Sequence, residues 1–398
     1  MEKIIKGRKN LQFYSTHDIS DQEINSVTDV LQSDFLSRGP KVVEFEAAIG
    51  SFCKGAKALA VNSATSALHL AYILAGVNES SLVWTSPITF VATANTAMQM
   101  GAKMDFVDIN SETLNICPEI LESKLREAKQ LNRLPHVVTA VHFGGNPCDM
   151  DAIYTLSKKY GFTVIEDASH ALGASYNGAP IGGDERSLAS IFSFHPVKMI
   201  TTGEGGALIV GTEAVWQKAD IMRSHGVNNL SDERNKKDMC PWYYEQTEIG
   251  YNYRMTEMQA AMGTVQIARL PDFVIKRNKL ANLYKNKLAN LPIKFQTISK
   301  GSISSYHLFT IELKKKSFDR DRLYQQLKEK RIASQVHYIP LYYHPFYKNL
   351  GFRDNYCKNA ERYFSSCLSI PLHQKLDEND INYVVENIKK FLRQSSNT

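Results

Sequence analysis

The stretch "FSFHPVKMITTGEGG", residues 192–206, reads as an apolar strand, a turn and a run of small residues that enters a second strand. It contains a single lysine, Lys198, and no other Lys, Arg, Asp or Glu before Glu204. A surface lysine usually has charged neighbours, so this one raises three alternatives. It could bind a phosphate, it could be an amine held ready for covalent chemistry, or it could be a solvated loop residue.

The residues around Lys198 favour the second alternative. The order G-x-x-x-x-G-K-[ST], which a P-loop lysine requires, is absent. A Schiff-base lysine must be neutral part of the time, and a largely desolvated pocket with few other cations favours the neutral form. The glycines that follow, Gly203, Gly205 and Gly206, allow the chain to turn tightly beneath a bulky cofactor.

The bulk properties exclude several classes of protein. A chain of 398 residues is too long for one ordinary core and predicts two domains. The net charge of +6 is small for this length and gives no case for binding nucleic acid. The six cysteines form no C-x-x-C pair, which predicts reduced thiols in a cytoplasmic protein and no metal site. No segment approaches membrane-spanning length, so we expect no membrane contact.

The order of the elements predicts an α/β fold. Short apolar runs alternate with helical patterns through the first two thirds of the chain, which indicates a mostly parallel sheet flanked by helices. A long helical pattern then begins at residue 257, and we expect it to be interrupted at Pro271. The final third reads as a smaller α+β unit. We therefore predict a large domain over residues 1–268, with an N-terminal arm, and a smaller C-terminal domain over residues 269–398.

Three features follow strands, where an α/β sheet binds its ligands. Residues 62–66, "NSATS", join a strand end to a helix start and suit an anion such as phosphate, although simple helix capping is the alternative. Asp167 ends another strand and is either a fixed partner for a cation or a solvated terminus. His170 could contact a cofactor hydroxyl or only pack, and Phe90 could cover a ring or only fill the core.

Together with Lys198, these features match the needs of pyridoxal 5'-phosphate (PLP). A cradle at residues 62–66 would hold the phosphate, and Asp167 would keep the pyridine nitrogen protonated so that the ring accepts electrons. Lys198 would bond to the cofactor aldehyde. PLP is therefore the predicted cofactor.

Several blocks of the chain resemble one known family. They are "FLSRGPKVVEFE" (35–46), "NSATSALHLA" (62–71), "EDASHALGA" (166–174), "FSFHPVKMITTGEGGALIV" (192–210), "GYNYRMTEMQAAMG" (250–263) and "QVHYIPLY" (335–342). In this order they resemble the fold-type I, PLP-dependent sugar aminotransferases of the DegT/DnrJ/EryC/StrS family, over nearly the whole chain. The resemblance implies that fold and that activity.

The family pattern implies catalytic roles for Lys198, as the Schiff-base lysine, and for Asp167, as the partner of the pyridine nitrogen. It implies a larger set of cofactor contacts, at Ala64, Thr65, Phe90, Asp167, His170, Ser193, Lys198 and Asn252. Phe90 resembles the ring-stacking residue. Asn252 resembles a residue that reaches the neighbouring subunit's cofactor, which implies a homodimer. Some relatives carry histidine in place of the lysine and act as dehydratases, so Lys198 favours transamination.

Within the family, the blocks are most similar to the transaminases of pseudaminic acid synthesis. This implies L-glutamate as amino donor, a UDP-linked 4-keto-6-deoxy-N-acetylhexosamine as acceptor, and UDP-4-amino-4,6-dideoxy-N-acetyl-β-L-altrosamine as product. The implied substrate contacts are Tyr14, Asp34, Phe35, Leu36, Ser37, Gln335, Val336, His337 and Tyr338. The alternatives are a sibling enzyme that makes the D-gluco 4-amino sugar or aminates C3, and a non-catalytic protein that binds a nucleotide sugar.

Overall fold

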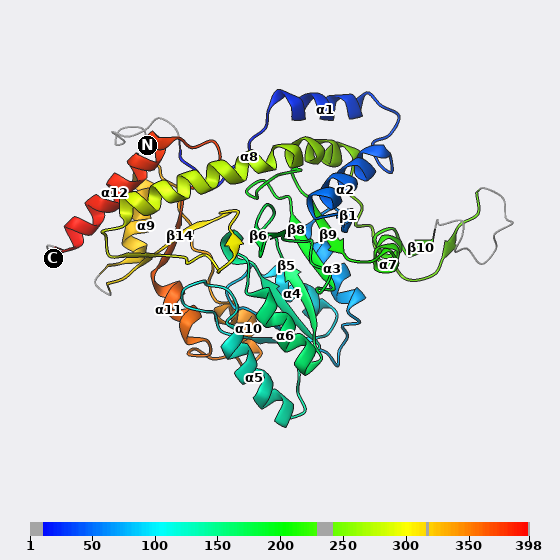
Figure 1. Ribbon diagram of the computed structural model, residues 1–398, viewed down its shortest axis with the longest axis horizontal. Helices are drawn as coiled ribbons and strands as arrows, with labels where there is room; N and C mark the ends of the chain where they lie inside the picture. Colours follow the sequence, from blue (N-terminus) through cyan, green and yellow to red (C-terminus); the bar gives the residue numbers. More distant parts are fainter. Residues whose placement is uncertain (1–10, 229–241, 316–317, 397–398) are drawn as a thin grey trace.

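The computed structural model describes residues 11–228, 242–315 and 318–396, and its central element is a seven-stranded sheet in the order β1-β9-β8-β5-β4-β2-β3 (Figure 1). The strands are β1 (Lys57–Val61), β2 (Leu82–Thr85), β3 (Lys103–Phe106), β4 (Val137–Val141), β5 (Thr163–Asp167), β8 (Ala189–Ser193) and β9 (Gly206–Val210). All neighbours from β3 to β8 are parallel, and β9 is antiparallel to both of its neighbours. The sheet is thus mixed and mostly parallel, as predicted.

Helices cover both faces of this sheet. They are α2 (Pro40–Phe52), α3 (Ala64–Leu74), α4 (Ala92–Gln99), α5 (Pro118–Gln130), α6 (Met150–Tyr160) and α7 (Glu213–Arg223), with α1 (Asp21–Leu31) outside them. Side chains alternate between the faces along each strand. In β5, Ile165 belongs to the core under α3 and α4, whereas Val164 belongs to the core under α5 and α6. Asp167 therefore faces the α4 side, and Glu166 faces the α6 side.

The long helix α8 (Glu257–Leu288) is continuous through Pro271, so the predicted interruption at that residue is wrong. A proline removes one N–H donor from a helix. Here the flanking side chains Leu270 and Phe273 are buried, and their packing holds the helix together across the missing bond. The helix runs along one side of the molecule, with α1 and α2 against its first half and α12 (Glu378–Ser396) against its second half.

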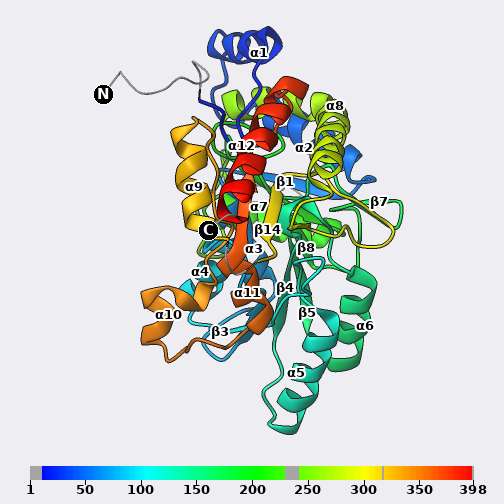
Figure 2. The same cartoon turned by 90° about the vertical axis from the view of Figure 1, so that its left-hand side faces the viewer.

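The C-terminal part builds a second core around an antiparallel sheet. Its strands are β12 (Ile293–Phe295), β14 (Phe309–Leu313) and β15 (Cys367–Ile370), and its helices are α9 (Arg320–Glu329) and α12. The elements η3 (Leu341–Tyr343), α10 (Pro345–Asn349) and α11 (Lys358–Ser366) instead contribute Tyr342, Tyr347 and Tyr363 to the core of the large sheet. Figure 2 shows α10 and α11 below α9 and α12, beside β3 and β4. The division into residues 1–268 and 269–398 stays a prediction.

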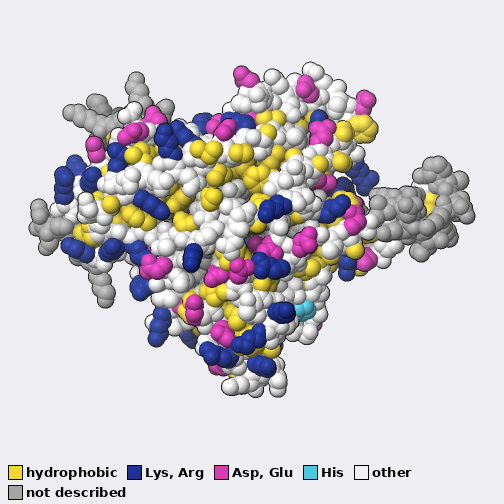
Figure 3. Space-filling view, in the orientation of Figure 1, with side chains coloured by type: hydrophobic (Ala, Val, Ile, Leu, Met, Phe, Trp, Pro, Cys, Tyr) yellow, Lys and Arg dark blue, Asp and Glu magenta, His cyan; other side chains and the backbone are white. Residues whose placement is uncertain are grey.

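The remaining elements are short. They are η1 (Phe143–Gly145), β6 (Ser175–Tyr176), β7 (Ala179–Pro180), β10 (Val227–Asn228), β11 (Glu245–Gln246) and β13 (Ser302–Ile303). Acidic and basic side chains are interspersed over the face shown in Figure 3. Within the described ranges, no helix has the length and apolar character needed to cross a bilayer. The described cysteines are free and buried, and Cys240 lies outside the described residues.

Candidate active site

The carboxyl ends of β1, β2, β4, β5 and β8 meet at one edge of the sheet, where they open into a pocket of about 640 Å³. The predicted site residues that line it are Tyr14, Ala64, Thr65, Phe90, Asp167, His170, Ser193, Lys198, Gln335, Val336, His337 and Tyr338. They come from the N-terminal arm, from the ends of four strands (β1, β2, β5 and β8) and from the segment after α9. The pocket thus unites residues separated by more than three hundred positions.

The remaining predicted residues lie outside this pocket. Asp34, Phe35, Leu36 and Ser37 are exposed in the connection between α1 and α2, and the Leu36 carbonyl accepts a hydrogen bond from the N–H of Glu257. This hydrogen bond places the segment Asp34–Ser37 beside the start of α8. Asn252 is also exposed, and its carbonyl lies 3.4 Å from Asn62 Nδ2, at the outer side of the turn that leads into α3. Neither group contacts the pocket of its own chain.

Lys198 lies in the loop between β8 and β9, and its side chain is half-buried in the pocket. Burial lowers the pKa of its amine to about 8, and the Asp167 carboxylate opposes that shift without cancelling it. No described residue accepts a hydrogen bond from Nζ. The loop itself is anchored, because Met199 is buried and the Ser15 hydroxyl donates to the Val197 carbonyl at 2.7 Å. The amine is therefore neutral for part of the time near pH 8, on a fixed backbone.

Asp167 is buried and held from two sides. Its Oδ2 accepts a hydrogen bond from Thr93 Oγ1 at 2.6 Å, and its Oδ1 accepts one from the N–H of Ser169 at 3.2 Å. Thr89 lies one turn before Thr93, with the two hydroxyl oxygens 2.8 Å apart. Thr93 was not among the predicted residues. Only one feature of the sequence points to Thr93 as a site residue: it is a threonine one helical turn after Thr89, near the start of α4.

The start of α3 is arranged to bind an anion. Ser63 caps the helix by accepting from the N–H of Ser66 at 3.1 Å, which leaves the N–H groups of Ala64 and Thr65 without intrahelical acceptors. A Cβ on Gly206 would lie 2.4 Å from the Ala64 nitrogen. Only glycine lets β9 approach this turn so closely. Ser193, the strand partner of Gly206, lines the same pocket. This set fits the phosphate group of PLP.

His170 is a neutral hydrogen-bond donor. Its Nδ1 accepts from the N–H of Gly144 at 3.3 Å, so the ring proton lies on Nε2, which is 3.2 Å from the Tyr338 hydroxyl. Burial, then Lys198 and His337, hold the pKa of His170 well below its usual value. The Tyr338 oxygen accepts from His170, and its own proton is free for a ligand. Buried His307, whose ring centroid lies 4.4 Å from that of His170, was not predicted.

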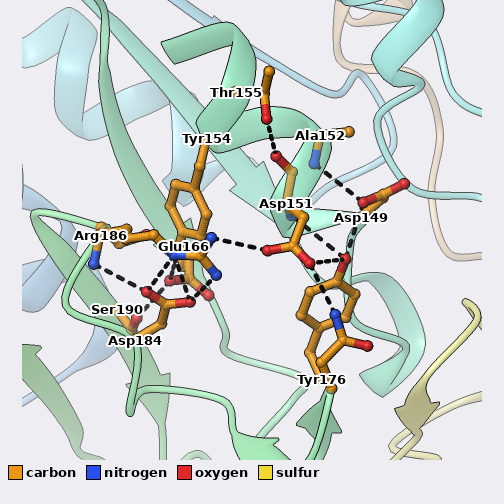
Figure 4. Close-up of polar contacts among 12 residues, drawn as sticks. Asp149, Asp151, Ala152, Tyr154, Thr155, Glu166, Tyr176, Asp184, Arg186 and Ser190 are labelled. Carbon is orange, nitrogen blue, oxygen red and sulfur yellow. Dashed lines mark hydrogen bonds and ion pairs between the residues drawn. The ribbon is translucent and has the colours of Figure 1, made fainter. Parts of the chain in front are cut away.

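The opposite face of β5 carries a separate polar cluster (Figure 4). Glu166 accepts hydrogen bonds from Tyr154 and Ser190, and its other oxygen lies 2.8 Å from His142 Nε2. Burial alone would raise the pKa of Glu166, but the hydrogen bond and charge of His142, with the hydrogen bond from Tyr154, outweigh it and lower that pKa. Arg186 lies over the Tyr154 ring at 4.2 Å. Every described group here has a protein partner, so the cluster supports the strand that presents Asp167.

Comparisons with known proteins agree with this architecture. The model of the DegT/DnrJ/EryC1/StrS aminotransferase family matches residues 17–389. A UDP-4-amino-4,6-dideoxy-N-acetyl-beta-L-altrosamine transaminase of Campylobacter jejuni is 38% identical over 387 residues, covering 96% of this chain and 97% of that protein. The solved structure of Helicobacter pylori PseC, an aminotransferase involved in the biosynthesis of pseudoaminic acid, has a TM-score of 0.88 at 30% identity, covering 97% of this chain and 100% of that chain.

A further solved structure bears on the cofactor. The PLP form of Spr1654 from Streptococcus pneumoniae has a TM-score of 0.86 at 27% identity, covering 97% of this chain and 99% of that chain. The free N–H group of Ala64, the buried carboxylate of Asp167 and the amine of Lys198 fit the phosphate, the pyridine nitrogen and the aldehyde of PLP. These findings confirm the family, the fold and the cofactor predicted from the sequence. The chain belongs to the DegT/DnrJ/EryC1/StrS family and is a PLP-dependent sugar aminotransferase.

Proposed function

We propose that this enzyme moves the amino group of L-glutamate to C4 of a UDP-linked 4-keto-6-deoxy-N-acetylhexosamine, giving UDP-4-amino-4,6-dideoxy-N-acetyl-β-L-altrosamine. The observation that carries the aminotransferase chemistry is the Lys198 amine, with its pKa lowered to about 8, in the same pocket as buried Asp167. The names of the Campylobacter and Helicobacter relatives support the choice of sugar.

The proposed cofactor contacts follow from the walls of the pocket. The N–H groups of Ala64 and Thr65, with the Ser193 hydroxyl, would hold the phosphate of PLP. Asp167 would hold the proton on the pyridine nitrogen, because its carboxylate is fixed by Thr93 and Ser169. Phe90, whose side chain is 59% exposed, would cover one face of the ring. When bound, PLP supplies a conjugated ring that accepts the electron pair released as a C–H bond breaks.

Lys198 would move the protons in both halves of the reaction. As a neutral amine it takes the proton from Cα of glutamate, and in the second half it delivers a proton to C4 of the sugar. An amine with a pKa of about 8 can both take up and release a proton near neutral pH, because its protonated and neutral forms are both populated there. His170 stays neutral and orients the Tyr338 hydroxyl toward the pocket.

The proposed substrate contacts fall into two groups. Tyr14 and the segment Gln335–Tyr338 form one wall of the pocket and would contact the sugar. The segment Asp34–Ser37 and Asn252 lie outside that pocket, and they would reach the active site of a second copy in a homodimer. We also propose a cytoplasmic location and the domain division given above.

The test is a two-step absorbance experiment on the PLP-loaded protein. Glutamate should convert the cofactor spectrum to that of the amine form, and a UDP-4-keto-sugar should restore the original spectrum. Restoration only by the β-L-arabino 4-ulose supports the proposal. Restoration only by the D-xylo epimer, or by a 3-keto sugar, would replace it with the sibling activity. A spectrum that glutamate does not change would indicate a binding protein without transaminase activity.

A further inference from the structure

A loop of the C-terminal part contacts the active site from outside the pocket. Residues 304–308, called here the clamp loop, connect β13 to β14, and all five are buried. None of them lines the pocket, yet the loop hydrogen-bonds to His170, which does. Buried backbone groups need hydrogen-bond partners, so the partners of this loop show which elements it holds together.

One side of the clamp loop is fixed to η1 and to His170. The N–H groups of Ser305 and Leu308 donate to the carbonyls of Gly145 and Gly144, at 3.1 and 3.2 Å. The Ser305 hydroxyl donates to the His170 carbonyl at 2.8 Å. A Cβ on Gly145 would lie 2.3 Å from Ser305 Oγ and 2.9 Å from the His170 carbonyl oxygen. Only glycine therefore lets these three segments approach so closely.

These contacts reach the His170 ring by two routes. The N–H of Gly144 donates to Nδ1 at 3.3 Å, and this bond keeps the ring proton on Nε2, which faces the Tyr338 hydroxyl at 3.2 Å. A bond of 3.3 Å is already long, so a small displacement of η1 breaks it. The ring of His307 touches the His170 ring directly, with centroids 4.4 Å apart. No described residue hydrogen-bonds to the His307 ring, whose buried Nδ1 has no partner, so it acts by contact.

The other side of the clamp loop is held by α8. Nη1 of Arg277 donates to the carbonyls of Tyr306 and His307, at 3.2 and 3.3 Å, and to that of Leu372 at 2.8 Å. Arg277 is fully buried, and no carboxylate of the described residues pairs with it. Burial lowers its pKa to about 9, so it stays charged at neutral pH. A buried cation without a counter-ion is costly, and the bonds that this one makes fix the clamp loop.

We propose that the clamp loop, held by Arg277, positions the His170 ring and through it the Tyr338 hydroxyl. Ser305 and His307 are its positioning residues. None of the three touches the pocket, so their effect on the reaction must pass through His170. A change in the loop should therefore matter only while the Tyr338 hydroxyl is present. This inference rests on the proposed contact between Tyr338 and the sugar.

The first test needs no substrate. NMR of PLP-loaded, full-length protein with 15N-labelled histidine reports which ring nitrogen carries the proton, and His170→Gln identifies the His170 signals. The wild type should show a single form, protonated on Nε2. In Ser305→Ala the His170 carbonyl loses its donor, the segment shifts, and the long bond to Nδ1 should break, so the single form should be lost. Unchanged His170 signals in Ser305→Ala would overturn the inference.

The matched control for Ser305→Ala is Ser157→Ala. It also removes a bond from a serine hydroxyl to a carbonyl, that of Phe162 at 2.5 Å, but at the end of α6 on the other face of the sheet. It should leave both the His170 signals and kcat/KM at their wild-type values. A change of the His170 signals in this control as large as in Ser305→Ala would contradict a specific role for the clamp loop.

The second test is a double-mutant cycle. Ser305→Ala and Tyr338→Phe should each lower kcat/KM for the sugar about 10-fold, as expected for the loss of one hydrogen bond. If Ser305 acts through the Tyr338 hydroxyl, the double variant should match Tyr338→Phe within about 2-fold. A serine with a merely structural role would multiply the two losses to about 100-fold, and that result would overturn the inference.

The failures of the two proposals are distinguishable. If Tyr338→Phe alone keeps the wild-type kcat/KM, the proposed sugar contact is wrong, and the NMR experiment still decides whether the loop positions His170. If Ser305→Ala does not fold, Asn278→Ala replaces it, because it removes only the 2.9 Å bond from α8 to the Ser304 carbonyl.

A further pair of variants tests the ring contact. His307→Ala should also lose the single His170 form, and His307→Phe should restore it, because the ring has a contact but no described hydrogen bond to lose. Wild-type His170 signals in both His307→Ala and Asn278→Ala would overturn the inference.

Discussion

Replacing Lys198 by methionine should make the apoenzyme more stable at neutral pH. In the folded chain the amine has a pKa of about 8, against 10.5 for an ordinary lysine. At pH 7 the amine is protonated in the folded and unfolded states alike, so folding must bury the charge. A pKa lowered from 10.5 to about 8 corresponds to a cost of about 3 kcal/mol. Methionine fills a similar volume without that charge. Because the lysine is half-buried, about 3 kcal/mol is an upper bound.

The stability of the wild type relative to Lys198→Met should rise with pH. Between pH 8 and 10.5 the unfolded state holds the proton that the folded state has lost, so the wild type becomes more stable as the pH rises through this window. The advantage of Lys198→Met should therefore be largest at pH 7 and shrink by pH 9.5. For a chain of this length, about 3 kcal/mol corresponds to a rise of about 3 °C in melting temperature.

The measurement is a pair of thermal scans of PLP-free protein at pH 7 and pH 9.5. Lys328→Met, on the exposed side of α9, is the matched control and should show no gain at either pH. The reasoning would be refuted by a variant that is no more stable than the wild type at pH 7. A gain in stability of equal size at both pH values would also refute it, because the cost of a buried charge must decrease when the Lys198 amine loses its proton.

Three further predictions test the surroundings of the cofactor. Thr93→Val removes the hydroxyl that holds Asp167 and should lower kcat about 10-fold, whereas Thr93→Ser should retain most of it in steady-state assays. Gly206→Ala places a methyl group 2.4 Å from the Ala64 nitrogen, so the dissociation constant for PLP should rise at least about 10-fold in a spectroscopic titration. Glu166→Gln disrupts a buried pair and should lower stability by about 3 kcal/mol in urea unfolding, with the difference vanishing as the pH falls well below 4.5 and the wild-type carboxylate is protonated.

Residues at strand ends were the predictable part of this site. Lys198 and Asp167 each follow a short apolar run, and parallel strands bring such positions to one edge whatever the details of packing. Thr93 and His307 carried no comparable signal. Thr93 lies within a helical pattern and contacts Asp167 from 74 positions away. His307 precedes a strand, and nothing in that strand indicates that it will pack against His170.

Packing over long sequence distances explains the remaining differences. The helix-breaking tendency of Pro271 is a local property, and the buried neighbours Leu270 and Phe273 override it. Likewise, the segment from Leu341 to Tyr363 lies in sequence between α9 and β15, which both belong to the smaller core, but it packs into the core of the large sheet. The local pattern of that segment indicates helices and turns. It does not indicate which of two cores they join.

The unbroken helix α8 rigidly connects the large core to the smaller core. At 1.5 Å per residue its 32 residues extend about 48 Å, from the α1–α2 layer to the α12 layer. A rigid-body swing of one core against the other would have to bend this rod. The Gln335–Tyr338 wall of the pocket is attached to the smaller core through the pairing of Gln335 with Ser369 of β15. Damage to the smaller core, such as removal of α12, would thus displace a wall of the active site without altering any residue that touches a ligand.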